Sequence, residues 1–154
     1  MSDIFHFFNG KLYDKKCIKQ WNLPPKMEEQ IGLTDYEYFF LTSSKEEQKH
    51  GELPHVHLSI FPTHYETVFL LEVETSTILP ELLHNTLKIL KESGNTILTS
   101  TGFCTHADLC HFGIFFSNTE LKRPNNIVDS VKNLDKVREV DLFEYNCEGC
   151  EQVK

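Results

Sequence analysis

The feature that most constrains the fold is an amphipathic helix pattern at residues 79–93, which lies between two strand-like runs. Apolar side chains recur there at the three- and four-residue spacing of a helix buried along one side, at Leu79, Leu82, Leu83, Leu87 and Leu90. Thr77 is a candidate N-cap, Pro80 suits the first turn, and Gly94 suits the residue after the last turn. Because such a helix must bury its apolar side, the neighbouring segments must supply a partner layer.

Strand patterns surround this helix. We predict strands at residues 67–75, 95–104, 109–116 and 137–145, with a register change in the last of them between Val137 and Val140. A second helix is predicted over 124–134, where Pro124 opens the segment. The order strand, helix, strand, strand, helix, strand predicts an α+β fold of the ferredoxin-like βαββαβ type, an antiparallel sheet with both helices on one face.

This unit is expected to span residues 66–146, and the flanking segments differ from it. Residues 1–65 are polar and interrupted by proline, but they contain two strand-like runs at 36–42 and 55–61. We expect them to form an N-terminal extension that adds strands and packs on the sheet. Residues 147–154 are expected to be a tail that contains two cysteines.

The pattern VFLLEVET…LPELLHNTLKILKESGNTIL…CHFGIFF…LDKVREVDLFEY resembles the ACT domain, a small regulatory module of amino-acid metabolism. Pro80 falls on the family's turn proline, Gly94 on its helix-ending glycine, and Ile97 on the isoleucine that follows. Val137 and Val140 match the closing valine pair. The resemblance covers about 80 of the 154 residues.

The resemblance implies a regulatory protein that binds a small molecule of amino-acid type, has no catalytic activity and forms a homodimer. It places the ligand at the turn between the first strand and the first helix, and the candidate ligand-binding residues are Ser76, Thr77, Pro80, Glu81 and Asn95. The sequence departs from the family at Glu81, where members have glycine, and at Thr96, where they have asparagine. Glu81 adds a negative charge at a position where the family accepts a carboxylate.

Composition and charge exclude several classes of protein. The chain is 40% hydrophobic and 25% charged, as expected for one folded domain, and its net charge is −8. That charge argues against nucleic acid or an anionic membrane as partner, because both require basic surface. No apolar run approaches the roughly 18 residues of a membrane span, and no signal peptide is evident, so we expect a cytoplasmic protein.

Two cysteines and two histidines lie close together in the predicted hairpin, at Cys104, His106, Cys110 and His111. Adjacent strand residues point to opposite faces, so Cys110 and His111 are poorly placed to bind one metal. Cys110 is in phase with Phe112 and is expected to be buried as a small apolar residue. Five cysteines in a chain without an evident export signal predict reduced thiols, or thiolates on a metal, rather than a disulfide framework.

A metal site is the main alternative function. Cys147 and Cys150 have the two-residue spacing at which both thiolates can bind one zinc ion. His55 and His57 share one face of a predicted strand, and the topology permits a site formed from His55, His57 or His64 with the two cysteines. Free thiols, a labile disulfide in the tail and surface histidines remain open.

Catalytic motifs are lacking in the sequence. We find no nucleophile with a paired base, no phosphate-binding glycine loop and no HExxH motif. An enzyme on a ferredoxin-like scaffold is the third alternative, because a fold does not determine a function.

Overall fold

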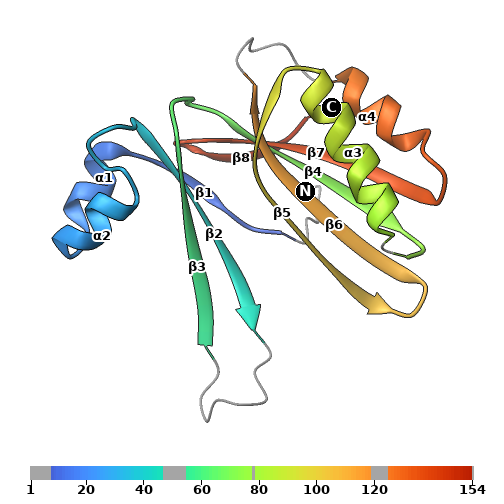
Figure 1. The fold of residues 1–154 in the computed structure, drawn as a ribbon, viewed down its shortest axis with the longest axis horizontal. Helices are drawn as coiled ribbons and strands as arrows, with labels where there is room; N and C mark the ends of the chain where they lie inside the picture. The colour runs from blue at the N-terminus through green and yellow to red at the C-terminus, as the bar shows by residue number, and fades with distance from the viewer. Residues whose placement is uncertain (1–7, 47–54, 78, 119–124, 154) are drawn as a thin grey trace.

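The computed structural model describes residues 8–46, 55–77, 79–118 and 125–153 and shows an α+β protein with two antiparallel sheets (Figure 1). The elements are β1 (Lys11–Asp14), α1 (Lys15–Gln20), α2 (Pro25–Gln30), β2 (Tyr38–Glu46), β3 (His55–Thr63), β4 (Val68–Thr75), α3 (Pro80–Glu92), β5 (Asn95–His106), β6 (Leu109–Asn118), α4 (Asn125–Lys132), β7 (Val137–Asn146) and β8 (Gly149–Gln152). The smaller sheet has the order β1-β2-β3, and the larger has the order β5-β6-β4-β7-β8. The predicted α+β class is confirmed. Among the helices of the described residues, none is long and apolar enough to cross a membrane.

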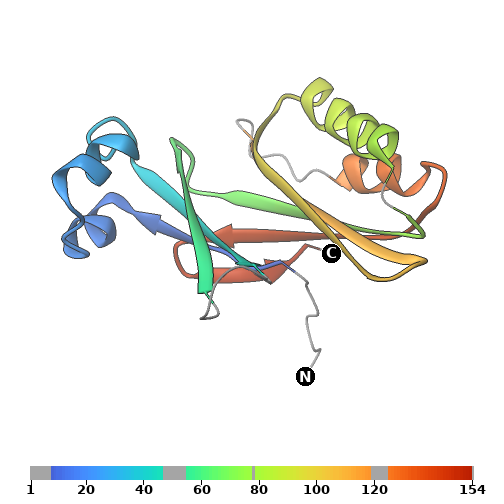
Figure 2. The ribbon, with the colours of Figure 1, turned by 60° about the horizontal axis from the view of Figure 1, so that its bottom comes forward.

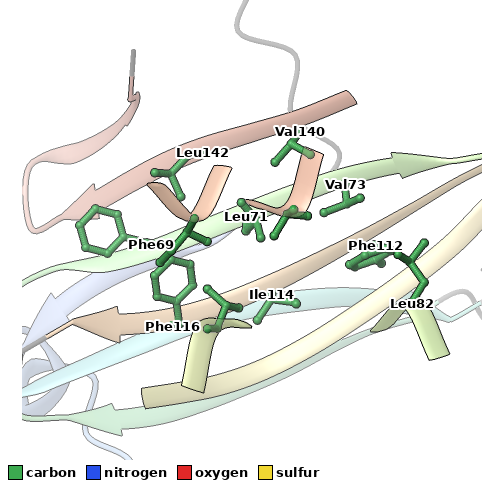
Figure 3. Close-up of a cluster of buried hydrophobic side chains, with 12 residues drawn as sticks. Phe69, Leu71, Val73, Leu82, Phe112, Ile114, Phe116, Val140 and Leu142 are labelled. Atoms are coloured by element: carbon green, nitrogen blue, oxygen red, sulfur yellow. The ribbon is translucent and has the colours of Figure 1, made fainter. Parts of the chain in front are cut away.

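One face of the five-stranded sheet packs against α3 and α4. Figure 2 shows both helices, α3 in yellow-green and α4 in orange, on the same side of this sheet. Alternate residues of β4, β6 and β7 meet the helices in one buried cluster (Figure 3), which includes Phe69, Leu71, Val73, Leu82, Leu90, Phe112, Ile114, Phe116, Ile127, Val131, Val140 and Leu142. The apolar side of the predicted helix at 79–93 therefore has the partner layer that its pattern requires.

The three-stranded sheet covers part of the other face. Leu12 of β1 and Phe40 of β2 are buried against strand residues of the larger sheet, namely Val68, Leu70, Phe115, Phe143 and Tyr145. The ring centroid of Phe40 lies 5.0 Å from that of Phe115 and 5.2 Å from that of Tyr145. The N-terminal extension thus shares a core with the sheet, and β4 is buried on both faces.

A third core lies between α1, α2 and the outer side of the small sheet. Ile18, Leu33 and Phe39 are buried there. Asp14 caps α1, because its carboxylate accepts the backbone N–H of Cys17 at 2.9 Å, and α2 begins at Pro25. The sequence interpretation missed both helices and β1, because six-residue helices and a four-residue strand show too little periodicity.

Several local predictions can be compared directly with the structure. Thr77 as N-cap is wrong, because the cap position is Leu79, whereas the Thr77 carbonyl accepts the Thr75 hydroxyl at 2.6 Å. The register change in the last predicted strand is confirmed as an irregularity opposite Glu74 and Thr75, where β7 skips Arg138. Part of the tail forms β8, which pairs with β7 through Tyr145 opposite Cys150.

Gly94 ends α3 with φ +82°, as its sequence position predicted. A Cβ at this position would meet no atom within 4 Å, so Gly94→Ala tests backbone strain without a packing change. We expect the free energy of unfolding to fall by about 1 kcal/mol, measured by urea denaturation. Glu92→Ala, at an exposed position in the last turn of the same helix, is the control and should have little effect. Equal losses for both variants would contradict the left-handed backbone at Gly94.

Candidate ligand-binding site

A cleft of about 220 Å³ lies where α3 begins, between that helix and the turn from α4 to β7. Its walls are formed by Leu79, Glu81, Leu82, Asn85, Leu134, Asp135 and Lys136. The two sides meet because β4 and β7 are antiparallel, with Thr75 at the end of β4 opposite Val137 at the start of β7. The segment that enters α3 and the segment that leaves α4 are therefore at the same end of the sheet.

Apolar residues hold the walls of this cleft to the core. Leu82 is buried, and Leu79 and Leu134 pack against the same cluster beneath the helices. The turn is closed by the backbone N–H of Leu134, which donates to Val131 at 3.0 Å, and Lys136 follows with φ +69°. This left-handed residue reverses the chain into β7.

The polar side chains of the cleft carry both signs of charge. Glu81 and Asp135 supply carboxylates, Lys136 supplies an ammonium group and Asn85 supplies an amide. Glu81, Asp135 and Lys136 are exposed, and Asn85 is partly buried. A lining of this kind can contact an ammonium group and a carboxylate of one small molecule.

The structure brings together only part of the predicted ligand-binding set. Ser76 and Thr77 lie in the connection from β4 to α3, and Pro80 and Glu81 lie in the first turn of α3, but of these only Glu81 lines the cleft.

Asn95 lies beyond the other end of α3 and does not belong with the rest of that set. The helix has 13 residues, which corresponds to about 20 Å at 1.5 Å per residue. The Asn95 amide is buried and donates to the Leu90 carbonyl at 2.9 Å, so it completes the C-terminal end of the helix.

The sequence interpretation missed Asn85, Leu134, Asp135 and Lys136 as lining residues. Asn85 is one helical turn beyond Glu81, so helix periodicity would have placed it on the same face. The predicted strand order also implied that the turn before β7 lies beside the start of α3. The charges of Asp135 and Lys136 looked like those of an ordinary exposed turn.

A larger cleft of about 470 Å³ lies at the opposite end of β4, lined by Asp14, Tyr38, Glu66, Thr67, Asn146, Cys147 and Glu148. Burial raises the pKa of the Cys147 thiol, and the nearby charges of Asp14, Cys17, Glu66 and Glu148 raise it further. A raised pKa keeps the thiol protonated at neutral pH, which makes it a poor nucleophile. The carboxylates here have no cationic side chain beside them in the lining.

Among the described side chains, the predicted zinc ligands are not gathered into one site. Cys147 lies in the short turn from β7 to β8 and Cys150 lies in β8, and burial raises the pKa of Cys150 as well. The ring of His64 stacks on that of Tyr36, with centroids 4.5 Å apart.

His57 lies far from this turn. It pairs with Ser44 in the distal part of the β2–β3 hairpin, whereas Tyr38 beside Cys147 pairs with Thr63. Thr63 is six positions further along the strand than His57, which corresponds to about 20 Å. His55 begins β3 still farther out, and its side chain lies outside the described residues. Among the described residues, no group of three or more His, Cys, Asp or Glu is arranged to hold a metal ion.

The hairpin of β5 and β6 corrects the expectation of reduced thiols, because Cys104 and Cys110 form a disulfide. The two residues are directly opposite in the register, with Cα atoms 3.9 Å apart. Cys110 is 2% exposed, so its predicted burial is confirmed. His111 is buried beside Phe103, with ring centroids 5.6 Å apart, whereas His106 is exposed. Cys17, Cys147 and Cys150 are free thiols.

Comparison with known proteins gives no assignment: no protein-family model matches the chain, and no curated protein matches it significantly.

Proposed function

We propose that residues 66–146 form a ferredoxin-like βαββαβ unit that acts as an ACT-like regulatory module and binds a small molecule of amino-acid type without transforming it. The order β5-β6-β4-β7 with α3 and α4 on one face supports the fold part of this proposal. The sequence resemblance supports the regulatory part. A homodimer and a cytoplasmic location belong to the same proposal.

The observation that carries the proposal is the cleft at the start of α3, whose lining carries both carboxylates and an ammonium group. In this proposal Lys136 binds the carboxylate of a zwitterion, and Glu81 and Asp135 bind its ammonium group; the presence of all three in the lining supports it. Glu81 then replaces the family's glycine with a group that receives the other end of the ligand. The cleft, at about 220 Å³, is smaller than the roughly 300 Å³ at which sites for drug-sized ligands begin, which favours a ligand of amino-acid size.

A thermal-shift screen over amino acids tests this function. A ligand at 100 times its dissociation constant is expected to add about 2.7 kcal/mol to the free energy of unfolding. The N-acetyl and carboxamide derivatives of the same amino acid should shift the midpoint less, because each lacks one of the two charges. No shift with any amino acid would overturn the proposal.

Variants then test the location of the site. Lys136→Gln and Glu81→Gln should each weaken binding by about tenfold or more, because a hydrogen bond to a charged group is lost. Glutamine at position 136 has the same left-handed backbone cost as lysine, so the change removes charge only. Lys91→Gln and Glu92→Gln, at the other end of α3, are the matched controls. Binding that is unchanged in the first pair would place the ligand elsewhere.

A further inference from the structure

A cleft of about 170 Å³ lies between the two sheets and shares no lining residue with the cleft at the start of α3. Its walls come from β2 and β3 of the small sheet and from β5 and β6 of the larger one. Figure 1 shows the β2–β3 pair and the β5–β6 pair diverging from the body of the molecule. Phe61 and Phe115 line this cleft, and every other described lining residue carries a hydroxyl group, namely Thr42, Ser43, Ser59, Thr99, Ser100 and Thr101.

Strand register explains why hydroxyl groups from both sheets meet here. Thr42 is two residues beyond Phe40, whose ring lies 5.0 Å from that of Phe115, so Thr42 is on the face of β2 that contacts the larger sheet. Ser59 is paired with Thr42 and therefore shares that face. On the other wall, Thr99 is paired with Phe115, and Thr101 follows at the two-residue period of a strand.

The hydroxyl groups of the two walls differ in what they can offer a ligand. The Thr42 hydroxyl donates to the Asn9 carbonyl at 2.9 Å, so its oxygen is left as an acceptor. Within the described ranges, the hydroxyls of Ser59, Thr99 and Thr101 make no hydrogen bond to other protein groups. These three can donate and accept, because a hydroxyl group has one hydrogen and two lone pairs.

The lining is also neutral. No charged side chain lines this cleft among the residues that the structure describes, whereas the clefts at Glu81 and at Cys147 both contain carboxylates. A charged ligand would lose hydration here without gaining an opposite charge. A purely apolar ligand would separate the hydroxyls from water without replacing their hydrogen bonds.

We propose that this cleft binds the pyranose ring of a neutral carbohydrate. Such a ring has hydroxyl groups that donate to and accept from the two walls, and its C–H groups form an apolar face that packs against Phe61 and Phe115. The volume is below the roughly 300 Å³ at which sites for drug-sized ligands begin, which favours a single ring. This second site is independent of the amino-acid-binding function proposed for the cleft at α3.

A titration of the ¹⁵N-labelled full-length protein with neutral methyl pyranosides tests the proposal. The backbone amide resonances around Thr42, Ser59 and Thr99 should shift and saturate with at least one of them. The methyl glycoside of the corresponding uronic acid should bind more weakly than the neutral sugar, because its carboxylate finds no cation in the lining. The same ring at the end of a disaccharide separates two sources: retained binding indicates the end of a glycan, and lost binding indicates a free monosaccharide.

Variants locate the bound sugar. Thr99→Val and Thr101→Val should each weaken binding by about fivefold, because one neutral hydrogen bond is lost while the branched shape of the side chain is kept. Thr96→Val, at an exposed position of β5 outside the cleft lining, is the matched control and should bind as the wild type does. Thermal unfolding midpoints equal to that of the wild type show that the variants are folded. Ser59→Ala, at an exposed position on the opposite wall, provides the same test without a change in β5.

Two results would overturn the carbohydrate site. One is the absence of any saturable shift with the neutral methyl pyranosides. The other is sugar binding that stays unchanged in Thr99→Val, Thr101→Val and Ser59→Ala. Lys136→Gln, in the cleft at α3, should leave the sugar titration unchanged. A negative amino-acid screen and a negative sugar titration are therefore separate results, and each overturns only its own site.

Discussion

Replacing Phe40 by alanine is expected to lower the free energy of unfolding by about 3–5 kcal/mol, the usual cost of removing a fully buried aromatic ring. Phe40 is 0% exposed and lies at the contact between the two sheets, beside Phe115 and Tyr145. The loss combines the transfer of the ring from the core with the cavity that it leaves. Urea denaturation followed by circular dichroism measures the change.

Tryptophan fluorescence, as a second signal, shows which part of the protein loses stability in this variant. Trp21 is the only tryptophan, and its ring lies 4.8 Å from that of Tyr13 in the small sheet, so its fluorescence reports on the N-terminal part. In the wild type both signals should change at the same urea concentration. In Phe40→Ala the fluorescence transition should occur at a lower urea concentration than the circular dichroism transition. Met27→Ala, on an exposed side chain, is the control. A loss below about 1 kcal/mol would show that the two sheets are stable independently of this contact.

Breaking the Cys104–Cys110 disulfide has the second largest expected effect. The bond closes a short loop, with six residues of sequence separation, and the chain-entropy relation gives about 2.4 kcal/mol for a loop of about seven residues. Cys104→Ser is the suitable change, because Cys104 is exposed whereas Cys110 is buried and remains as a small apolar residue. The variant should lose this amount of stability in urea denaturation.

Reduction provides the matched comparison. Dithiothreitol should lower the stability of the wild type to that of Cys104→Ser and should leave the variant unchanged. Cys17→Ser, at an exposed free thiol, should have little effect in either condition. If wild type and Cys104→Ser are equally stable without reductant, the bond does not form in solution. In a reducing cytoplasm the protein would have the lower of the two stabilities.

The sequence predicted the periodic parts of the fold well. The apolar spacing of 79–93 and the two-residue alternation around it located α3, β4, β5, β6 and β7, because long amphipathic segments carry a strong signal. The short elements α1, α2, β1 and β8 carry too few residues for a period to emerge. The contact of Phe40 with Phe115 depends on how two sheets pack, which local pattern does not encode.

The candidate site was predictable only in part. The position of Glu81 followed from the turn into α3, but Asn95 was assigned to the same site although a whole helix separates them. Predicting Lys136 as a lining residue requires knowing which loops lie at the same end of the sheet. The disulfide depends on a register that places Cys104 opposite Cys110, and counting cysteines could not reveal it.

Because the two sheets share a core, a shortened gene that lacked the N-terminal part would encode a sheet with exposed apolar surface. A gene that encoded only residues 67–154 would produce a sheet with Val68, Leu70 and Phe115 uncovered on one side. Contiguous apolar surface of that kind leads to association or aggregation. The extension therefore covers apolar surface that the larger sheet would otherwise expose to solvent.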